Sequence, residues 1–302
     1  MLKTHRPMSL SSPHTREDTF TCTLIPTVFK PQPNRARPFL RWIGGKRALV
    51  PTLVKLLPTD VSERFYVEPF LGAGNFFFRI KPTVGLLSDI NTDLIQSFIL
   101  IRDEPVSFYR SVLRNIRQDS EKHYYRIRER FNSSKSHRLR AVYFTYLNRT
   151  CFNGIYRVNR EGYFNTPYGF RDPASFPTLS EIVSLSETLK GHLIRCGDFS
   201  ETIEAAPNDS FIYADPPYPP ISKTAHFDKY TRFGFGEQQQ RKLSDLLTKA
   251  DQRGCKFMLS NADTVLVRTL YKGFRIRQVE VRRSVSAHRN RKPAAEVIVT
   301  NY

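Results

Sequence analysis

A short apolar run followed at once by a glycine-rich turn narrows the choice of folds for this chain. FYVEPF (65–70) is rich in aromatic and β-branched residues, and it continues into Leu71-Gly72-Ala73-Gly74 and a segment with a helical apolar pattern. A strand, a glycine turn and a helix in this order form the βα unit of nucleotide-binding α/β sheets. The turn has no complete GxGxxG pattern, so by itself it indicates the sheet and leaves the ligand open.

Carboxylates stand at the ends of three further strand-like runs, at Asp89, Asp198 and Asp215. Open α/β sheets bind their ligands in the crevice at the carboxyl ends of the strands. We therefore predict a Rossmann-like mixed α/β sheet, with helices on both faces and a small-molecule site at that edge. For Asp89 and Asp198 the alternative is a purely structural role, as a helix cap or in a turn.

The chain divides into segments of different composition. Residues 1–36 are polar, contain several prolines and show no sustained apolar period, which indicates an N-terminal extension. Residues 95–190 separate the second and third predicted strands and are rich in Arg, Tyr and Phe, in a mainly helical pattern. Because this insertion is far too long for a simple connection, we expect a separate subdomain there. Residues 37–94 and 191–302 would then form one sheet domain.

The charge balance points to a polyanionic partner. The 302 residues include 47 Lys and Arg against 28 Asp and Glu, a formal net charge of +19, and each phosphate that such a surface neutralises releases a condensed counterion. A basic protein without such a partner is the alternative. The four cysteines lie far apart, without a Cys-x-x-Cys pair, so we expect no metal. The lack of a long apolar run and of a secretory signal core predicts a cytoplasmic protein without membrane association.

The most specific motif is Asp215-Pro216-Pro217-Tyr218, directly after an apolar strand. An exocyclic base amine is a poor nucleophile because its lone pair is delocalised into the ring. Two acceptors on its N–H groups favour a pyramidal nitrogen and stabilise the charge that develops there. We expect the Asp215 carboxylate and the Pro216 carbonyl to be these catalytic acceptors, and Tyr218 to stack on an extruded base. The alternative is a rigid turn after a core strand.

Seven motifs carry a resemblance to a known family. FLRWIGGKR, VEPFLGAG, LLSDINTDLI, YLNRTCFNG, GYFNTPYG, DPPYPP and LSNAD resemble, in this order, the motifs of Dam-type, class alpha amino-methyltransferases that methylate adenine in DNA, from about Phe39 to Tyr302. The resemblance implies methyl transfer from S-adenosylmethionine to the 6-amino group of adenine in duplex DNA. S-adenosylhomocysteine would be the product and GATC the target. It also makes residues 95–190 the target-recognition subdomain and the sheet domain the catalytic one.

The resemblance also implies a cofactor site. Trp42 and Lys46 look like N-terminal cofactor contacts, with Lys46 meeting the methionine carboxylate, and Asp89 looks like the acid that holds the ribose. Asp198 and Phe199 look like contacts of the cofactor adenine. The predicted cofactor-binding residues are Trp42, Lys46, Phe70, Gly72, Gly74, Asp89, Asp198, Phe199 and Asp215. The alternatives are a solvated Lys46, an N-capping Asp89 and a strand-ending turn at Asp198.

Arginines and aromatic residues interleave in residues 138–171, with a single acid among them. Such a segment can bind phosphate, read guanine edges and fill the gap left by a flipped base, and a solvated basic face is the alternative. By resemblance, Phe152 with Asn153 is the intercalating element and Arg157 a guanine reader. The basic run 282–292, between two strand-like segments, is interpreted as a hairpin that grips the DNA backbone. The predicted DNA-binding residues are Arg41, Phe152, Asn153, Arg157, Pro167, Arg171, Arg289 and Arg291.

One departure from the Dam pattern concerns the recognition segment. After Tyr168-Gly169 the chain has Phe170-Arg171, where the pattern has Arg followed by an aromatic residue, so contacts to the outer base pairs are expected to differ. Two rival hypotheses stay open. One is an amino-methyltransferase acting on cytosine, RNA or a protein amide, and the other is a DNA-binding regulator without catalysis, against which the intact motifs argue. We expect a monomer, and the sequence leaves open whether a partner nuclease exists.

Overall fold

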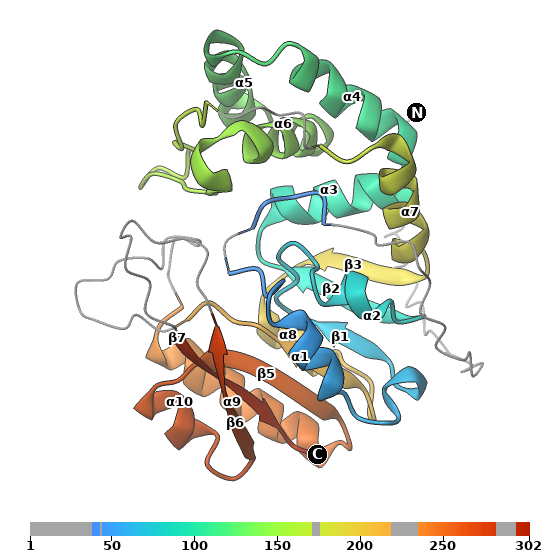
Figure 1. Cartoon of the computed structure of the whole chain (residues 1–302), viewed down its shortest axis with the longest axis vertical. Helices are drawn as coiled ribbons and strands as arrows, with labels where there is room; N and C mark the ends of the chain where they lie inside the picture. The colour runs from blue at the N-terminus through green and yellow to red at the C-terminus, as the bar shows by residue number, and fades with distance from the viewer. Residues whose placement is uncertain (1–37, 43, 171–175, 219–234, 282–293) are drawn as a thin grey trace, which may run out of the picture.

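The computed structural model describes residues 38–42, 44–170, 176–218, 235–281 and 294–302, and a seven-stranded sheet forms its centre (Figure 1). The strands are β1 (Tyr66–Glu68), β2 (Gly85–Asp89), β3 (His192–Cys196), β4 (Phe211–Ala214), β5 (Lys256–Ala262), β6 (Arg275–Val281) and β7 (Ala294–Thr300). Their order is β3-β2-β1-β4-β5-β7-β6. Pairing is parallel from β3 to β5, whereas β7 runs antiparallel to both β5 and β6. The sheet is therefore mixed, and the predicted Rossmann-like fold is confirmed.

The strand order reverses next to β1. From β1 the chain proceeds to β2 and β3 on one side, and it later returns to place β4 and β5 on the other side. In this register Tyr66 pairs with Gly85 of β2 and with Phe211 of β4. A reversal of this kind leaves a crevice at the carboxyl ends of the flanking strands, because the two connecting segments leave in opposite directions. The ends of β1, β2 and β4 therefore define where a ligand can bind.

Alternate residues of the central strands face two different cores. Tyr66, Phe211 and Tyr213 pack in the core formed with helices α1 to α7, whereas Val67 and Ile212 pack in the core formed with α8, α9 and α10. All residues of β1 and β4 are buried. Continuous burial is typical of parallel strands covered on both faces. The prediction of helices on both faces is thus confirmed.

The helices connect the strands and cover the sheet. They are α1 (Val50–Lys55), α2 (Phe77–Ile80), α3 (Thr92–Asp103), α4 (Pro105–Arg117), α5 (Glu121–Ser133), α6 (His137–Thr150), α7 (Leu179–Leu189), α8 (Phe199–Glu204), α9 (Glu237–Gln252) and α10 (Val265–Leu270), with 3-10 turns η1 (Val61–Glu63) and η2 (Phe152–Gly154). None of the helices in the described part of the chain is long and apolar enough to cross a membrane.

Helices α3 to α7 lie between β2 and β3 in the chain, and α4, α5 and α6 lie apart from the sheet in Figure 1. Side-chain caps set the start of several of them. Asn91 caps α3, Ser120 caps α5, and Thr178 forms a capping box with Glu181 on α7. Because α3 begins at Thr92 and packs against α6 and α7, one helix crosses the predicted boundary at residue 95. The division into 37–94 with 191–302 and 95–190 stays a prediction.

Candidate active site

The Asp215-Pro216-Pro217-Tyr218 turn follows β4 directly, at the reversal of strand order. The Asp215 Oδ1 atom lies 2.8 Å from the ammonium nitrogen of Lys46, and it accepts a hydrogen bond of 2.9 Å from the Ser260 hydroxyl on β5. Lys46 also lies 4.4 Å from the centre of the Tyr218 ring and donates to the Gly44 carbonyl at 3.3 Å. A buried cation from the segment before α1 thus contacts both ends of the turn.

Two acceptor atoms of the turn stay open. Both hydrogen bonds to Asp215 reach Oδ1, and within the described part of the chain no group donates to Oδ2. Pro216 is buried, and its carbonyl likewise receives no hydrogen bond from any residue that the structure describes. A carboxylate has about four lone-pair positions and a carbonyl two. The Asp215 Oδ2 atom and the Pro216 carbonyl therefore remain able to accept hydrogen bonds from a planar amine.

Asp89, at the end of β2, holds the glycine turn. Its Oδ2 atom accepts from the Gly72 N–H and its Oδ1 atom from the Asn91 N–H, each at 3.0 Å. Burial raises the pKa of Asp89, and the backbone N–H bonds lower it. Gly72 has a φ of 49°, and a Cβ there would lie 2.9 Å from the Trp42 ring. The turn therefore needs glycine at this position, both for its left-handed backbone and for its contact with Trp42.

Three phenylalanines pack together beside the glycine turn. The rings of Phe70 and Phe199 stack with their centres 5.3 Å apart, and Phe235 packs edge-on against Phe70 at 5.6 Å. Asp198 caps α8 by accepting from the Ser200 N–H at 3.0 Å. The capping role is thus observed for Asp198, and its contact with a cofactor adenine stays a prediction, as does that of Phe199.

Two buried carboxyl groups of the site escaped the sequence analysis. Glu68 ends β1 and is 2% exposed, and burial raises its pKa well above the usual range, with further contributions from Asp215 and Asp89. Glu296 on β7 is 4% exposed. Burial, followed by the charges of Asp215 and Glu296, raises the pKa of Tyr218 far above its usual value. Glu68 ends a strand, as the other acids of the site do, and this position in the sequence could have identified it. No feature of the sequence marks Glu296 as a residue of the site.

A reciprocal pair of hydrogen bonds joins the site to the helical insertion. The Asn148 side chain on α6 accepts from the Arg41 N–H at 2.8 Å and donates to the Arg41 carbonyl at 2.7 Å. Gly154 packs so closely on Arg41 that a Cβ there would lie 2.5 Å from the Arg41 Cβ. Arg41, predicted to contact DNA, is therefore fixed beside η2, which contains Phe152 and Asn153.

The loop after α6 presents several predicted DNA contacts together. The Phe152 N–H donates to the Pro167 carbonyl at 2.9 Å, and the Phe152 side chain is 51% exposed. Asn153 has a left-handed φ of 55°. Arg157 donates from Nε to the Asn165 side chain at 2.7 Å and from its guanidinium to the Asn165 carbonyl at 3.2 Å. An exposed aromatic ring and an arginine held by its own loop thus occupy one surface segment.

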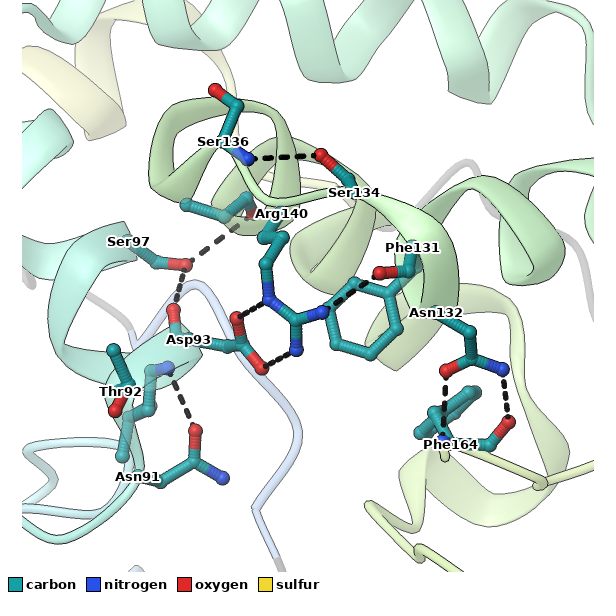
Figure 2. A network of polar contacts seen from close by, with 12 residues as sticks. Asn91, Thr92, Asp93, Ser97, Phe131, Asn132, Ser134, Ser136, Arg140 and Phe164 are labelled. Atoms are coloured by element: carbon teal, nitrogen blue, oxygen red, sulfur yellow. Dashed lines mark hydrogen bonds and ion pairs between the residues drawn. The ribbon is translucent and has the colours of Figure 1, made fainter. Parts of the chain in front are cut away.

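Polar contacts anchor this loop to the helices of the insertion (Figure 2). The Asn132 side chain accepts from the Phe164 N–H at 2.9 Å and donates to the Phe164 carbonyl at 3.0 Å. On the other side of the network, Arg140 of α6 binds both carboxylate oxygens of Asp93 on α3, at 2.8 and 2.7 Å, and donates to the Phe131 carbonyl of α5 at 2.8 Å. These bonds join α3, α5, α6 and the loop into one support.

Some predicted residues cannot be located. Arg171, Arg289, Arg291 and the N-terminal extension 1–36 lie outside the described residues. The strands that flank the basic run, β6 and β7, pair antiparallel, which agrees with the predicted hairpin up to its described ends. Among the residues that the structure describes, no group of three or more His, Cys, Asp or Glu side chains is arranged to hold a metal ion.

Comparisons with known proteins identify the family of this chain. The D12 class N6 adenine-specific DNA methyltransferase family matches residues 42–285. The chain is 38% identical over 255 residues to a DNA adenine methylase of Vibrio cholerae, covering 83% of this chain and 91% of that protein. It is 34% identical over 269 residues to the DNA adenine methylase of Escherichia coli, covering 88% and 95%.

A third relative is named a type II methyltransferase. The chain is 34% identical over 287 residues to the type II methyltransferase M.MjaIII of Methanocaldococcus jannaschii, covering 88% of this chain and 99% of that protein. The family match spans most of the chain, and it includes both the glycine turn and the Asp-Pro-Pro-Tyr turn. The predicted resemblance to Dam-type enzymes is therefore confirmed, and the chain belongs to the D12 class of N6 adenine-specific DNA methyltransferases.

Proposed function

We propose that the chain transfers the methyl group of S-adenosylmethionine to the 6-amino group of adenine within GATC in duplex DNA. The observation that carries the proposal is the pair of open acceptors after β4, the Asp215 Oδ2 atom and the Pro216 carbonyl. Family membership supports an adenine amine as their substrate. The Dam-type order of motifs supports GATC as the target.

The turn would activate the amine by geometry and charge. If each acceptor takes one N–H of the 6-amino group, the nitrogen becomes more pyramidal and its lone pair points away from the acceptors, toward the methyl donor. Positive charge would develop on this nitrogen as it takes the methyl group and the sulfonium becomes a neutral thioether, and the Asp215 carboxylate would stabilise that charge until one N–H proton leaves. Lys46 and Ser260 keep Oδ1 occupied, so Oδ2 stays directed to the substrate. Lys46 lies 4.4 Å from the centre of the Tyr218 ring, and under the proposal the base would stack on the face of the ring away from Lys46.

The surroundings of the glycine turn fit S-adenosylmethionine, which supplies an electrophilic methyl group on a sulfonium. Asp89 and Asp215 end the strands on either side of β1, and carboxylates at this edge suit a ligand with a sulfonium and an ammonium group. Asp89 keeps lone pairs for ribose hydroxyls beyond those used by the backbone. The Lys46 ammonium donates to Asp215 and to Gly44, and its third hydrogen is available for the methionine carboxylate.

The loop after α6 would read and open the duplex. The half-exposed Phe152 ring is suited to fill the gap that an extruded adenine leaves, and Arg157 carries the planar donor pattern that matches a guanine edge. In the present conformation the Arg157 donors bind Asn165, so reading a base would need this contact to be exchanged. Arg41 lies beside Phe152 and can contact the same part of the duplex.

The test is methyl transfer to defined nucleic acids. Labelled S-adenosylmethionine is incubated with a duplex that contains one GATC, with the same duplex lacking its adenine, with each single strand and with the matching RNA. Endonucleases that require or are blocked by adenine methylation at GATC then locate the product. Label in the first substrate alone is expected. Label in cytosine or RNA would overturn the substrate, and labelled adenine outside GATC would overturn only the target sequence.

A further inference from the structure

Two buried side-chain amides, on helix α9 and strand β5, form a chain of hydrogen bonds that ends at the Asp-Pro-Pro-Tyr turn. Gln240 on α9 donates from Nε2 to the Pro217 carbonyl at 3.1 Å, and its Oε1 atom accepts from the Asn261 side chain on β5 at 3.0 Å. The Asn261 Oδ1 atom in turn accepts from the Ala262 N–H at 2.8 Å. Gln240 and Asn261 are both completely buried. Helix α9 and strand β5 thus hold the Asp-Pro-Pro-Tyr turn through one continuous chain of hydrogen bonds.

The groups at the two ends of this hydrogen-bond chain determine which amide atoms donate and which accept. A backbone N–H at Ala262 only donates, so the Asn261 oxygen must face it and the Asn261 NH₂ must face Gln240. Gln240 then presents its oxygen to Asn261 and its NH₂ to the Pro217 carbonyl, which only accepts. No flip of either amide preserves all three bonds. The hydrogen-bond chain therefore specifies one orientation of the Gln240 amide.

The bond to Pro217 limits the freedom of the whole turn. Proline fixes φ near −65°, so in two consecutive prolines the remaining backbone torsions are few. Holding the Pro217 carbonyl restricts the ψ torsion of Pro217, which sets where Tyr218 follows. Because the Pro217 ring also fixes φ, the peptide plane that carries the preceding Pro216 carbonyl is held relative to Pro217. Asp215 is held separately, by Lys46 and Ser260. The turn is thus fixed at both sides of Pro216, whose own carbonyl receives no hydrogen bond from the residues that the structure describes.

We propose that Gln240 is a positioning residue for methyl transfer: through Pro217 it aims the Pro216 carbonyl and the Tyr218 ring at the target base. The proposal rests on the proposed role of the Asp215–Tyr218 turn as the site of the amine. It assigns to Gln240 and Asn261 no contact with DNA or with the cofactor. A loss of the Gln240 donor should therefore lower the rate of the chemical step and leave both binding steps nearly unchanged.

The first test is Gln240→Met, which keeps the side-chain length and removes the donor. A displacement of reacting groups by about 1 Å can cost on the order of 100-fold in rate, so we expect kcat to fall by about 10- to 100-fold. The KM for a GATC duplex and the dissociation constant of S-adenosylmethionine should stay within about threefold of wild type. Gln238→Met is the matched control, because Gln238 lies exposed on the same helix.

The second test is Gln240→Glu. This variant replaces the amide donor by a carboxyl group, which can donate a hydrogen bond only when it is protonated. When ionised, the introduced carboxylate repels the Pro217 carbonyl. When protonated, it can donate to Pro217 and still accept from Asn261. Relative to wild type at each pH, kcat of Gln240→Glu should rise on acidification, by up to about tenfold per pH unit while the carboxyl group is mostly ionised. Gln240→Met should show a constant ratio. A merely structural role would give no such recovery at low pH.

The possible results distinguish a failure of the Gln240 proposal from a failure of the proposed function of the Asp215–Tyr218 turn. If Asp215→Ala is inactive while Gln240→Met matches Gln238→Met, or if Gln240→Glu loses activity that low pH does not restore, Gln240 does not position the turn. If Asp215→Ala itself remains fully active, the proposed function of the turn fails first. Thermal unfolding with and without S-adenosylmethionine shows whether each variant is folded. Should Gln240→Met not fold, the pH profile of Gln240→Glu still decides.

Discussion

Replacing Asp215 by Asn is the sharpest perturbation of the turn, because it changes one atom of the proposed acceptor pair and keeps the volume. Lys46 and Ser260 both donate to the Oδ1 atom. An amide that replaces the carboxylate must present its oxygen to these donors, since its NH₂ would otherwise face an ammonium group. The NH₂ is then left where Oδ2 stood, facing the N–H groups of the substrate. The variant therefore exchanges an acceptor for a donor where the amine binds.

The expected loss of rate can be estimated from enzymes that lose one preorganised group which stabilises charge in the transition state. Removing one such partner costs roughly 2.7 to 4 kcal/mol in oxyanion-hole enzymes, or about 100- to 1,000-fold in rate. We expect a loss of this size for Asp215→Asn and for Asp215→Ala. Asp215→Ala should also be less stable, because it leaves the 7% exposed Lys46 side chain without its carboxylate. Asp215→Asn also removes the charge but keeps an oxygen acceptor for Lys46, so its loss of stability should be smaller than that of Asp215→Ala.

The assay is single-turnover transfer of a labelled methyl group to a duplex with one GATC, with enzyme in excess. Duplex affinity is measured separately by fluorescence anisotropy and should change little. Asp245→Asn on the exposed face of α9 is the control. If Asp215→Asn transfers methyl within about threefold of the wild-type rate, Oδ2 is not the acceptor and the mechanism above is wrong.

Three further predictions concern the cofactor, stability and DNA. Asp89→Ala should weaken S-adenosylmethionine binding in calorimetry with less effect on DNA binding; equal affinity would exclude Asp89 as a ligand. Because its folded pKa is raised, Glu68 stabilises the fold only below its unfolded pKa and loses that contribution as pH rises. Glu68→Gln should therefore gain thermal stability over wild type from about pH 4.5 upward, and a constant difference would contradict this. Arg157→Ala should cost about 1 to 3 kcal/mol of discrimination at one base pair. Arg289→Ala or Arg291→Ala should instead weaken all duplexes and lower the salt slope by about 0.9 per lost contact; a uniform loss for Arg157→Ala would make it a phosphate contact.

The parts of the molecule that the sequence predicts are those encoded by local pattern. A β-branched strand, a glycine turn and a following helix are contiguous, so FYVEPF and Gly72 predict their own geometry and the edge at which Asp89 and Asp215 meet. Parallel strands bring their carboxyl ends to one edge whatever the connections contain. This is why three strand-end acids are enough to predict a candidate site at that edge.

The parts that escaped prediction depend on contacts between distant segments. Lys46 meets Asp215 only because the strand order reverses between β1 and β4. Gln240 belongs to a run, EQQQRK, whose composition indicates an exposed first helical turn, yet it is fully buried. Asn261 likewise interrupts an apolar strand without a local reason. Buried polar groups need partners, and those partners are visible only in three dimensions.

The distribution of charge links the two functions of the chain. The net charge of +19 suits a polyanionic duplex, yet carboxyl groups gather at the strand ends, where burial, with smaller contributions from Asp215 and Asp89, raises the pKa of Glu68. A cationic cofactor favours such a site, and DNA phosphates do not. Under the proposed function, the two ligands would therefore favour different parts of the chain, although both must meet at one adenine. The Lys46 ammonium group pairs with Asp215 Oδ1 and leaves Oδ2 as the proposed acceptor for the base.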